Sequence, residues 1–347
     1  MIEYKKGNLL ESEAEALVNT VNCVGVMGKG IALQFKQAFP DNFKEYEKAC
    51  KNNLVMPGKM LIVDTGSIFN PRYIINFPTK RHWKGKSKIE DIKSGLIDFV
   101  EKIREYGIKS VAIPPLGCGN GGLDWDQVRP LIEESALKVP DVLFMVYPPV
   151  GTPEPDKMPV GTEKPKLTRA RALLIMLMNL YAAPGYKLSM LEIQKLAYFL
   201  QECGEDLKLR FVKAQYGPYA DNLNHVLQRL EGHYIRGYGD RNRDAEIYLL
   251  PEVVREAEEF LSQLKDESTD KRLRDTKQII EGYETPYGLE LLATTDWTIK
   301  HYPDARVDVK RAIDHFKAWN ERKKKVFKET HIEMAWRHVT QVYKKRN

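Results

Sequence analysis

A proline-rich segment near the middle of the chain sets the strongest limit on how this protein can fold. Residues 148–167 read PPVGTPEPDKMPVGTEKPKL, in which six of the twenty residues are proline. Proline fixes φ and has no backbone N–H to donate, so such a segment is typical of an extended, semi-rigid spacer. We therefore expect two domains, residues 1–148 and 168–347, joined by a linker at 149–167.

Before this linker, strand and helix patterns alternate. Such alternation predicts an α/β sheet covered by helices, with ligands at the carboxyl ends of the strands. The run at 110–114 is largely apolar, as a buried central strand should be, and a cluster of glycines follows it. We expect strands at 2–6, 16–22, 59–64, 73–77, 110–114 and 142–147, and helices at 31–38, 42–52, 89–106 and 125–137.

After the linker the patterns are mainly helical. Residues 189–204, SMLEIQKLAYFLQECG, begin with Ser189 and Glu192 at the spacing of a capping box and end at Gly204, a common helix stop. No cluster of catalytic side chains stands out, which favours a scaffold or binding module. Further helices are expected at 251–265, 271–283, 286–300, 307–319 and 325–345, with a possible strand at 247–251.

Charge and cysteine content narrow the classes of function. The net charge of +6 is carried by residues 321–347, with nine Lys+Arg against three Asp+Glu. That segment can attract nucleic acid or an acidic protein surface, although a solvated lysine-rich helix is the simpler interpretation. Cys23, Cys50, Cys118 and Cys203 lack C-x-x-C spacing, which disfavours structural zinc and fits a reducing cytoplasm. No apolar run suggests a membrane span or a signal peptide.

Two glycine-rich loops indicate a phosphate-bearing ligand. The first is GVMGKG at 25–30 and the second is GCGNGG at 117–122. Glycine allows positive φ and close backbone approach, so successive N–H groups can converge on an anion. Two such loops on adjacent strands can clamp a diphosphate, although ordinary tight turns are the alternative. Neither loop matches the Walker A pattern or the dinucleotide fingerprint, which disfavours a nucleoside triphosphate and a hydride-transfer cofactor.

Several segments of the first domain resemble macrodomains, which bind ADP-ribose. VNTVN at 18–22 is similar to the VNAAN segment of that family. The segments GNLLESEAEALVN at 7–19, MGKGIALQFKQAFP at 27–40 and PPLGCGNGGLDWDQV at 114–128 resemble the subgroup that contains the terminal ADP-ribose glycohydrolase. The resemblance covers residues 1–148. It implies a mixed sheet between helices, with ADP-ribose across its top and the diphosphate between the two loops.

The resemblance also implies roles for individual residues. Asn8 would face the adenine amino group, where the family usually has an aspartate, and Asn22 would face the distal ribose. The backbones of the two loops would hold the diphosphate. Cys118 is interpreted as a small loop residue rather than a nucleophile. The expected ADP-ribose contacts are Asn8, Leu9, Asn19, Asn22, Gly28, Lys29, Gly30, Ile31, Pro115, Leu116, Gly117, Cys118, Gly119, Asn120 and Gly121.

Lys80 is the candidate catalytic residue. It closes the segment FPTK at the end of a predicted strand, where partial desolvation of its ammonium would lower its pKa. The free amine can then attack C1″ of an ADP-ribosyl group or its ring-opened aldehyde. By the residues alone, a solvated lysine in the basic segment TKRHWKGKSK is the alternative. In the resembling subgroup a lysine at the matching position is catalytic.

One departure from that subgroup concerns the second loop. Protein-directed glycohydrolases of the subgroup have an aspartate where this chain has Gly121, and Asp124 is expected to cap the next helix instead. A mechanism through that aspartate is therefore not expected, and a different substrate is implied.

The whole chain resembles the DarG family of bacterial DNA ADP-ribosyl glycohydrolases, in its macrodomain type, its lysine in a PTK segment and its long helical second domain. The resemblance implies removal of ADP-ribose from thymidine in DNA, which would reverse the toxin DarT. Arg81, His82 and Trp83 are the candidate contacts to single-stranded DNA, through charge and base stacking. An exposed basic loop with Trp83 tucked against the sheet is the alternative.

The second domain resembles the Panacea domain over residues 168–300, through KLAYF at 195–199 and the YGPY turn at 216–219, which would orient two helices. That resemblance implies toxin binding rather than catalysis. We thus expect a cytoplasmic enzyme and antitoxin that needs no metal or other cofactor. The alternatives are a non-catalytic ADP-ribose reader with a toxin-binding tail, and a glycohydrolase acting on ADP-ribosylated protein or RNA.

Overall fold

The computed structural model describes residues 1–149, 158–183, 185–239 and 245–346. Residues 1–163 pack as one compact unit, and most of residues 164–347 pack as a second. Much of the predicted proline-rich linker, residues 150–157, lies outside the described residues.

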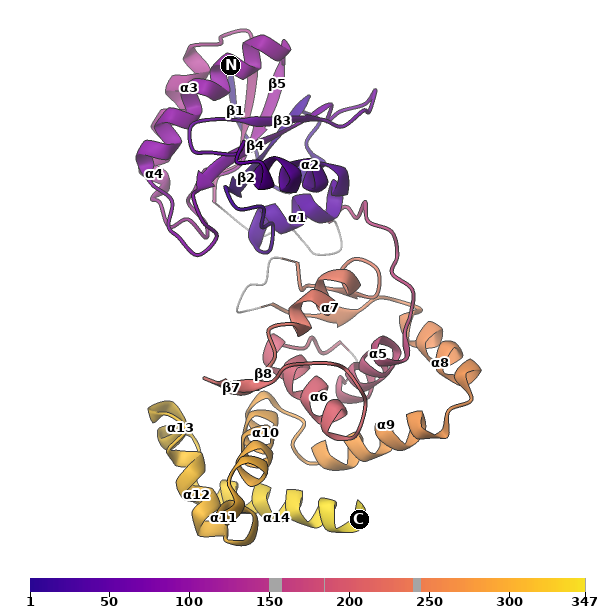
Figure 1. Ribbon diagram of the computed structural model, residues 1–347. Helices are drawn as coiled ribbons and strands as arrows, with labels where there is room; N and C mark the ends of the chain where they lie inside the picture. The colour runs from indigo at the N-terminus through magenta and orange to yellow at the C-terminus, as the bar shows by residue number, and fades with distance from the viewer. Residues whose placement is uncertain (150–157, 184, 240–244, 347) are drawn as a thin grey trace. The chain divides into compact units, whose positions relative to one another are not determined.

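The first unit is built on a six-stranded mixed sheet (Figure 1). Every neighbouring pair of strands is parallel except β3 and β4, which are antiparallel. The strands lie in the order β1-β6-β5-β2-β4-β3 and are β1 (Ile2–Tyr4), β2 (Ala16–Asn22), β3 (Leu61–Asp64), β4 (Tyr73–Lys80), β5 (Ser110–Ile113) and β6 (Leu143–Val146). This arrangement confirms the expected α/β fold.

Helices cover both faces of the sheet (Figure 1). Successive side chains of a strand point to opposite faces. On β2, Ala16 and Val18 pack in the core with α3 (Ile89–Tyr106) and α4 (Trp125–Leu137). Leu17 and Val21 face the other side, in clusters with residues of α1 (Gly30–Ala38) and α2 (Pro40–Lys51). All four predicted helices therefore form, and both ends of each helix lie within two residues of the predicted bounds.

The strand that carries Lys80 is longer than the sequence predicts. The expected strand ends at residue 77, but β4 continues through Pro78 to Lys80. The prolyl nitrogen cannot donate to a ladder, yet β3 pairs with β4 only as far as the register pair Leu61–Asn76. Beyond that pair, β3 does not lie beside β4. The N–H that Pro78 lacks is therefore not needed for a hydrogen bond to β3.

The end of the predicted linker packs on the first unit. The Gly161 N–H donates to the Gln37 carbonyl oxygen at 2.8 Å. A Cβ at Gly161 would lie 2.3 Å from the Ala38 oxygen, so this contact needs glycine. Met158 joins the apolar cluster around Leu9 and Phe35. Part of the predicted linker, at Met158 and Gly161, therefore packs against the first unit.

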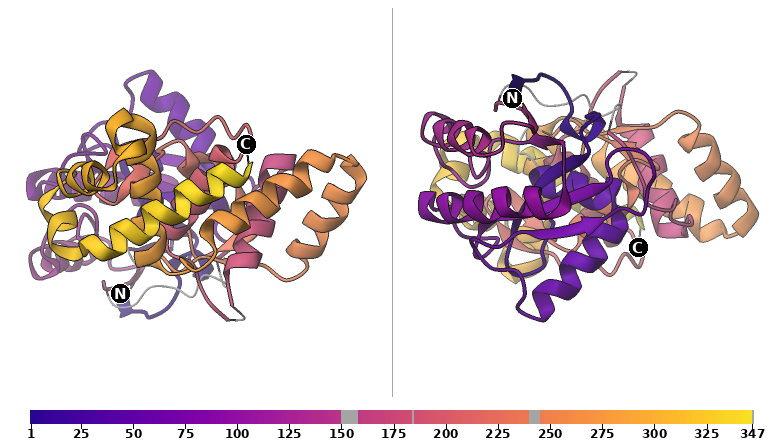
Figure 2. Two further views of the ribbon diagram at one scale, coloured as in Figure 1. Left: turned by 90° about the horizontal axis from the view of Figure 1, so that it is seen from below. Right: turned by 90° about the horizontal axis from the view of Figure 1, so that it is seen from above.

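The second unit is mainly helical and is held around the buried helix α10. Two short pairs of antiparallel strands accompany the helices, and α14, the yellow helix in Figure 2, packs against α10. The helices are α5 (Arg169–Tyr181), α6 (Met190–Glu202), α7 (Leu223–Leu230), α8 (Val253–Leu264), α9 (Glu267–Ile280), α10 (Pro286–His301), α11 (Pro303–Val307), α12 (Val309–Lys317), α13 (Glu321–Val326) and α14 (Glu329–Arg346). The strands of the two pairs are β7 (Val212–Ala214), β8 (Gly217–Tyr219), β9 (Ile235–Arg236) and β10 (Tyr248–Leu249).

Several expectations for this unit are confirmed and two are wrong. The capping box of Ser189 and Glu192 is present at the start of α6. The expected helix at 307–319 forms as α12, and the Asp308 carboxylate caps it by accepting the Lys310 N–H. The expected helix at 325–345 begins too early, because α13 ends at Val326 and α14 starts only at Glu329. The YGPY turn is not a connection between helices. Gly217–Tyr219 forms β8, which pairs antiparallel with β7.

Among the described helices, none is both long enough and apolar enough to cross a bilayer.

Candidate active site

The two glycine loops meet at the carboxyl end of the sheet. They follow β2 and β5, which are adjacent and parallel. A Cβ on Gly30, whose φ is +59°, would lie 2.8 Å from the Asn120 amide nitrogen, so the first loop touches the second here. Lys29 is the N-cap of α1, and no side chain caps this helix end. Its first N–H groups therefore lack intrahelical and side-chain cap partners and offer an anion site beside the second loop.

Asn22 shapes the first loop from within. Its side-chain oxygen accepts the Val24 N–H at 3.0 Å, and its amide nitrogen donates to the Val26 carbonyl at 2.5 Å. The Tyr46 hydroxyl donates to the Asn22 carbonyl at 2.7 Å. The predicted contact of Asn22 with the distal ribose stays a prediction, and these bonds show that the same side chain also holds the loop in shape.

Asn19 lies below this loop rather than on its surface. The side chain is fully buried, and its amide donates to the Asn76 side-chain oxygen at 3.0 Å. Met27 of the first loop lies over it, with its sulfur 3.8 Å from the Asn19 amide nitrogen. In this structure Asn19 therefore supports the loop from inside the fold.

The expected adenine end of the site is at Asn8. Its side-chain oxygen accepts the Leu10 N–H at 3.0 Å and caps the short helix η1 (Leu9–Glu11). Its amide nitrogen donates to the Met158 sulfur at 3.5 Å. Leu9 is buried, and Ile31 packs against the same apolar cluster. This end of the expected cleft is thus apolar, as an adenine ring requires.

The second loop is anchored by a residue that the sequence did not single out. The Ser87 N–H donates to the Gly121 carbonyl at 3.1 Å. A Cβ on Gly121 would lie 2.1 Å from the Gly117 carbonyl oxygen and 2.3 Å from the Ser87 hydroxyl. Leu116 is buried beneath the loop, while Pro115 and Cys118 are partly exposed. Burial raises the pKa of the Cys118 thiol to about 11, which agrees with a structural role.

Lys80 links the two loops. It pairs with Asn22 across β4 and β2, beyond a register shift between Val21 and Asn22. Its ammonium donates to the Asn120 carbonyl at 2.5 Å. Burial lowers the pKa of Lys80, and the charges of Lys86 and Lys29 lower it further. A half-buried amine with a lowered pKa is a candidate nucleophile.

No carboxylate of the second loop supports this amine. Asp124 accepts the Asp126 N–H at 3.0 Å and caps α4, as expected from the sequence. In the described part of the chain, no three His, Cys, Asp or Glu residues are grouped so as to hold a metal ion.

The three predicted DNA contacts follow Lys80 and differ in their partners and exposure. Arg81 is held by Asp91, with its Nε and Nη2 at 3.2 and 3.0 Å from the two carboxylate oxygens. His82 stacks on Trp83 at 5.5 Å between ring centroids. Trp83 is 49% exposed, so the alternative in which it is tucked against the sheet is wrong.

We expect Gly121→Ala to weaken ADP-ribose binding by about tenfold or more, because the added methyl group must displace the Gly117 backbone and thereby distort the second loop. Titration calorimetry with ADP-ribose measures the change. Leu137→Ala is the control, since Leu137 is 79% exposed and is not among the expected ADP-ribose contacts. Equal affinities for the two variants would contradict this account of the loop.

Comparison with known proteins agrees with this geometry. The Macro domain family matches residues 18–132. A Thermus aquaticus protein named DNA ADP-ribosyl glycohydrolase is 49% identical over 335 residues, covering 96% of this chain and 92% of the relative. A Thermosipho africanus protein, named a DNA ADP-ribosyl transferase-DNA ADP-ribosyl glycohydrolase fusion protein, is 37% identical over 44% of this chain and 42% of its own length.

Among solved structures, the macrodomain of Mycobacterium tuberculosis DarG is 57% identical, covers 43% of this chain and 99% of that chain, and has a TM-score of 0.43. The identity to the Thermus aquaticus relative extends over both domains and nearly the full length of each chain. This chain therefore belongs to the family of DNA ADP-ribosyl glycohydrolases.

Proposed function

We propose that this protein removes ADP-ribose from ADP-ribosylated thymidine in DNA. The observation that carries the proposal is the Lys80 amine, which has a lowered pKa and contacts the second glycine loop at Asn120. Family membership supports the substrate, because the relative that matches over nearly the whole chain is named for activity on ADP-ribosylated DNA. Release of ADP-ribose leaves an intact base, so the reaction is a form of DNA repair.

The mechanism follows from the order of groups along the site. Backbone N–H groups of the two loops and the first turn of α1 hold the diphosphate, which fixes the distal ribose at the end of β4. The neutral Lys80 amine attacks C1″ of the closed ribose ring, which still carries the base. A C–N bond to lysine forms, and the bond from C1″ to the base breaks.

The remaining steps restore the enzyme. The base leaves with the bonding electron pair and takes up the proton that the attacking amine loses. Water then adds to C1″ and displaces the lysine, which releases ADP-ribose and regenerates the amine. Because no carboxylate of the second loop is present to activate water, the amine carries more of the chemistry than in a site with a loop aspartate.

A direct assay tests this function. The full chain is incubated with an oligonucleotide that carries ADP-ribosylated thymidine, and free ADP-ribose is followed over time. We expect catalytic release. Tight ADP-ribose binding without release would instead favour a non-catalytic reader, and release only from ADP-ribosylated protein or RNA would favour the third alternative.

The DNA strand is proposed to leave the site along Arg81, His82 and Trp83. Trp83 is half exposed, with the Lys84 ammonium 4.9 Å from its ring centroid, so a base can stack on the free area of the ring. A single strand fits this role better than a duplex, because its bases are unstacked and accessible. A substrate in DNA and four free cysteines support a location in the cytoplasm.

The helical unit is proposed to bind the partner toxin DarT, which makes the protein an antitoxin. The Thermosipho africanus relative supports this pairing, since its name joins a DNA ADP-ribosyl transferase to a glycohydrolase in one chain. The test is co-expression of the full chain carrying Lys80→Ala with the toxin, followed by purification through a tag on the toxin. Failure of the two proteins to copurify would show that the helical unit does not have this role.

A further inference from the structure

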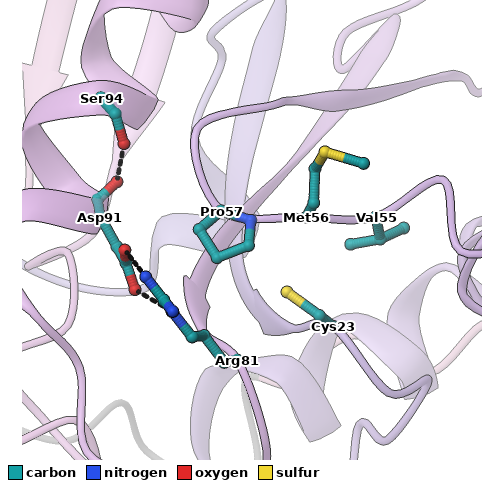
Figure 3. Close-up of a pocket in the computed structure, with 7 residues that line it drawn as sticks. All are labelled: Cys23, Val55, Met56, Pro57, Arg81, Asp91 and Ser94. Atoms are coloured by element: carbon teal, nitrogen blue, oxygen red, sulfur yellow. Dashed lines mark hydrogen bonds and ion pairs between the residues drawn. The ribbon is translucent and has the colours of Figure 1, made fainter.

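A cavity of about 510 Å³ lies next to Lys80 in the first unit (Figure 3). The Arg81–Asp91 pair lies at one end, and Val55, Met56 and Cys23 lie at the other. The lining residues are Cys23, Val55, Met56, Pro57, Arg81, Asp91 and Ser94. None of the predicted ADP-ribose contacts is among them. The cavity is therefore a separate feature of the carboxyl end of the sheet.

The order of the strands places this cavity beyond the reacting carbon. The second loop follows β5, the first follows β2, and Lys80 ends β4, which is the next strand across the sheet. The cavity begins one residue further on: the Cys23 thiol lies 3.4 Å from the Lys80 carbonyl oxygen, and Arg81 follows Lys80 directly. Val55, Met56 and Pro57 precede β3, the strand beyond β4.

This order determines what a bound substrate would bring to the cavity. With the diphosphate between the two loops, the distal ribose reaches Lys80 with C1″ at the amine. The group bonded to C1″ then extends away from the diphosphate, which is toward the cavity. That group is the one released by the reaction, so the cavity lies where the leaving group has to be held.

The lining suits a nucleobase. Val55, Met56 and Pro57 form an apolar wall, and the volume is in the range of small-molecule sites. Asp91 uses two nitrogens of Arg81 and leaves the guanidinium with further N–H groups for carbonyl or phosphate oxygens. Burial raises the pKa of the Cys23 thiol to about 11, so this side chain is a neutral part of the wall.

We propose that this cavity binds the nucleobase from which ADP-ribose is removed, with Val55, Met56 and Pro57 against the face of the base and Arg81 at its polar edge. The proposal rests on the proposed function, since it assigns a site to the leaving group of that reaction. The buried Asp91 carboxylate fixes the Arg81 guanidinium. A donor that is already fixed can orient the base without a further loss of side-chain entropy.

The test uses two charge-matched substitutions at neighbouring exposed residues. Met56 lines the cavity and is 49% exposed, so Met56→Glu places a carboxylate in the cavity without unfolding the protein. Leu54 is 66% exposed and does not line it, so Leu54→Glu adds the same charge nearby. Binding is measured in a Lys80→Ala background with free ADP-ribose and with ADP-ribosylated thymidine.

In the background protein, ADP-ribosylated thymidine is expected to bind about tenfold more tightly than ADP-ribose, because the base adds contacts. Met56→Glu should abolish that gain and leave ADP-ribose affinity unchanged, whereas Leu54→Glu should keep both. The same effect of both variants, or an unchanged gain in Met56→Glu, overturns the proposal. Failure of the wild-type protein to release ADP-ribose from DNA overturns the proposed function separately, because the binding measurement does not depend on turnover.

Discussion

Replacing Lys80 with alanine is expected to lower the turnover number on ADP-ribosylated thymidine by about 100- to 10,000-fold, the range in which a single acid–base or nucleophilic group contributes. Affinity for free ADP-ribose should change by less than about threefold, since the backbone of the two loops supplies the diphosphate contacts. Single-turnover release of ADP-ribose and calorimetry measure the two quantities. Wild-type activity in this variant would remove Lys80 from the mechanism and leave the fold assignment intact.

The protonation state of Lys80 gives a sharper test than its removal. The reaction needs the neutral amine, so the rate should rise with pH until the pKa of Lys80, which burial and the charges of Lys86 and Lys29 lower from the ordinary 10.5. Lys86→Met removes one of these positive charges. The pKa of Lys80 should then rise, and the rising part of the rate profile should move to higher pH. Lys80→Arg keeps a cation that cannot lose its proton and should stay inactive at every pH.

The sequence was sufficient to predict the sheet, both glycine loops and the strand that ends in lysine. These features are encoded locally: short apolar runs define β2 and β5, and glycines mark where each strand turns. The position of Lys80 beside the second loop also follows, because parallel strands bring their carboxyl ends to one edge. Only the length of β4 was underestimated, since the expected strand stops at residue 77 and β4 continues through Pro78 to Lys80.

Other parts of the site depend on contacts between distant segments. Ser87 lies in the basic segment TKRHWKGKSK and was given no role, yet its N–H holds the second loop at Gly121. Tyr46 on α2 fixes Asn22 through a bond across 24 residues. The segment Val55–Pro57 has no motif, and it becomes a wall of the cavity only because β3 pairs with β4. No local pattern reports such pairings.

The basic segment at residues 321–347 also contains a contact that its composition does not predict. Its lysines were interpreted as a solvated face, and most of those with described side chains are exposed. Lys323 is fully buried instead, and its ammonium donates to Glu290 at 2.8 Å and to the Thr294 hydroxyl at 2.9 Å. Burial lowers the pKa of Lys323 to about 8, and Glu290 opposes this shift. Glu290 is 33 residues away from Lys323 in sequence, so the composition of residues 321–347 could not reveal the pair.

Replacing Glu290 with alanine is expected to destabilise the helical unit by about 3–5 kcal/mol, the cost of leaving a buried charge without its partner. Glu290 is 2% exposed on α10 and accepts bonds from Lys323 and from Arg322, whose Nη1 and Nη2 lie 2.5 and 3.2 Å from its carboxylate oxygens. Arg322 and Lys323 belong to α13, so the carboxylate fastens that helix to α10.

The substitution also affects a second buried lysine. Lys195 on α6 donates to the Pro218 carbonyl at 2.6 Å, and burial together with the charge of Lys323 lowers its pKa to about 7. Glu290 raises the pKa of both lysines, so its loss lowers both, and each buried amine must then either lose its proton or stay as a cation without its partner. Urea unfolding of the full chain, followed by the circular dichroism of the helices, measures the change. Glu333→Ala is the control, because its bridge to Arg337 is exposed and should contribute less than about 1 kcal/mol.

A double substitution separates the lost charge pair from the lost packing. Glu290→Leu with Lys323→Met removes both charges and keeps apolar volume, so it should recover most of the stability that either charge-breaking substitution loses. The macrodomain has its own core, and Glu290→Ala should therefore release ADP-ribose from DNA at the wild-type rate while losing the complex with the toxin. Loss of both activities together would mean that the two units do not fold independently, and an unchanged unfolding midpoint would contradict the role of Glu290 in holding α13.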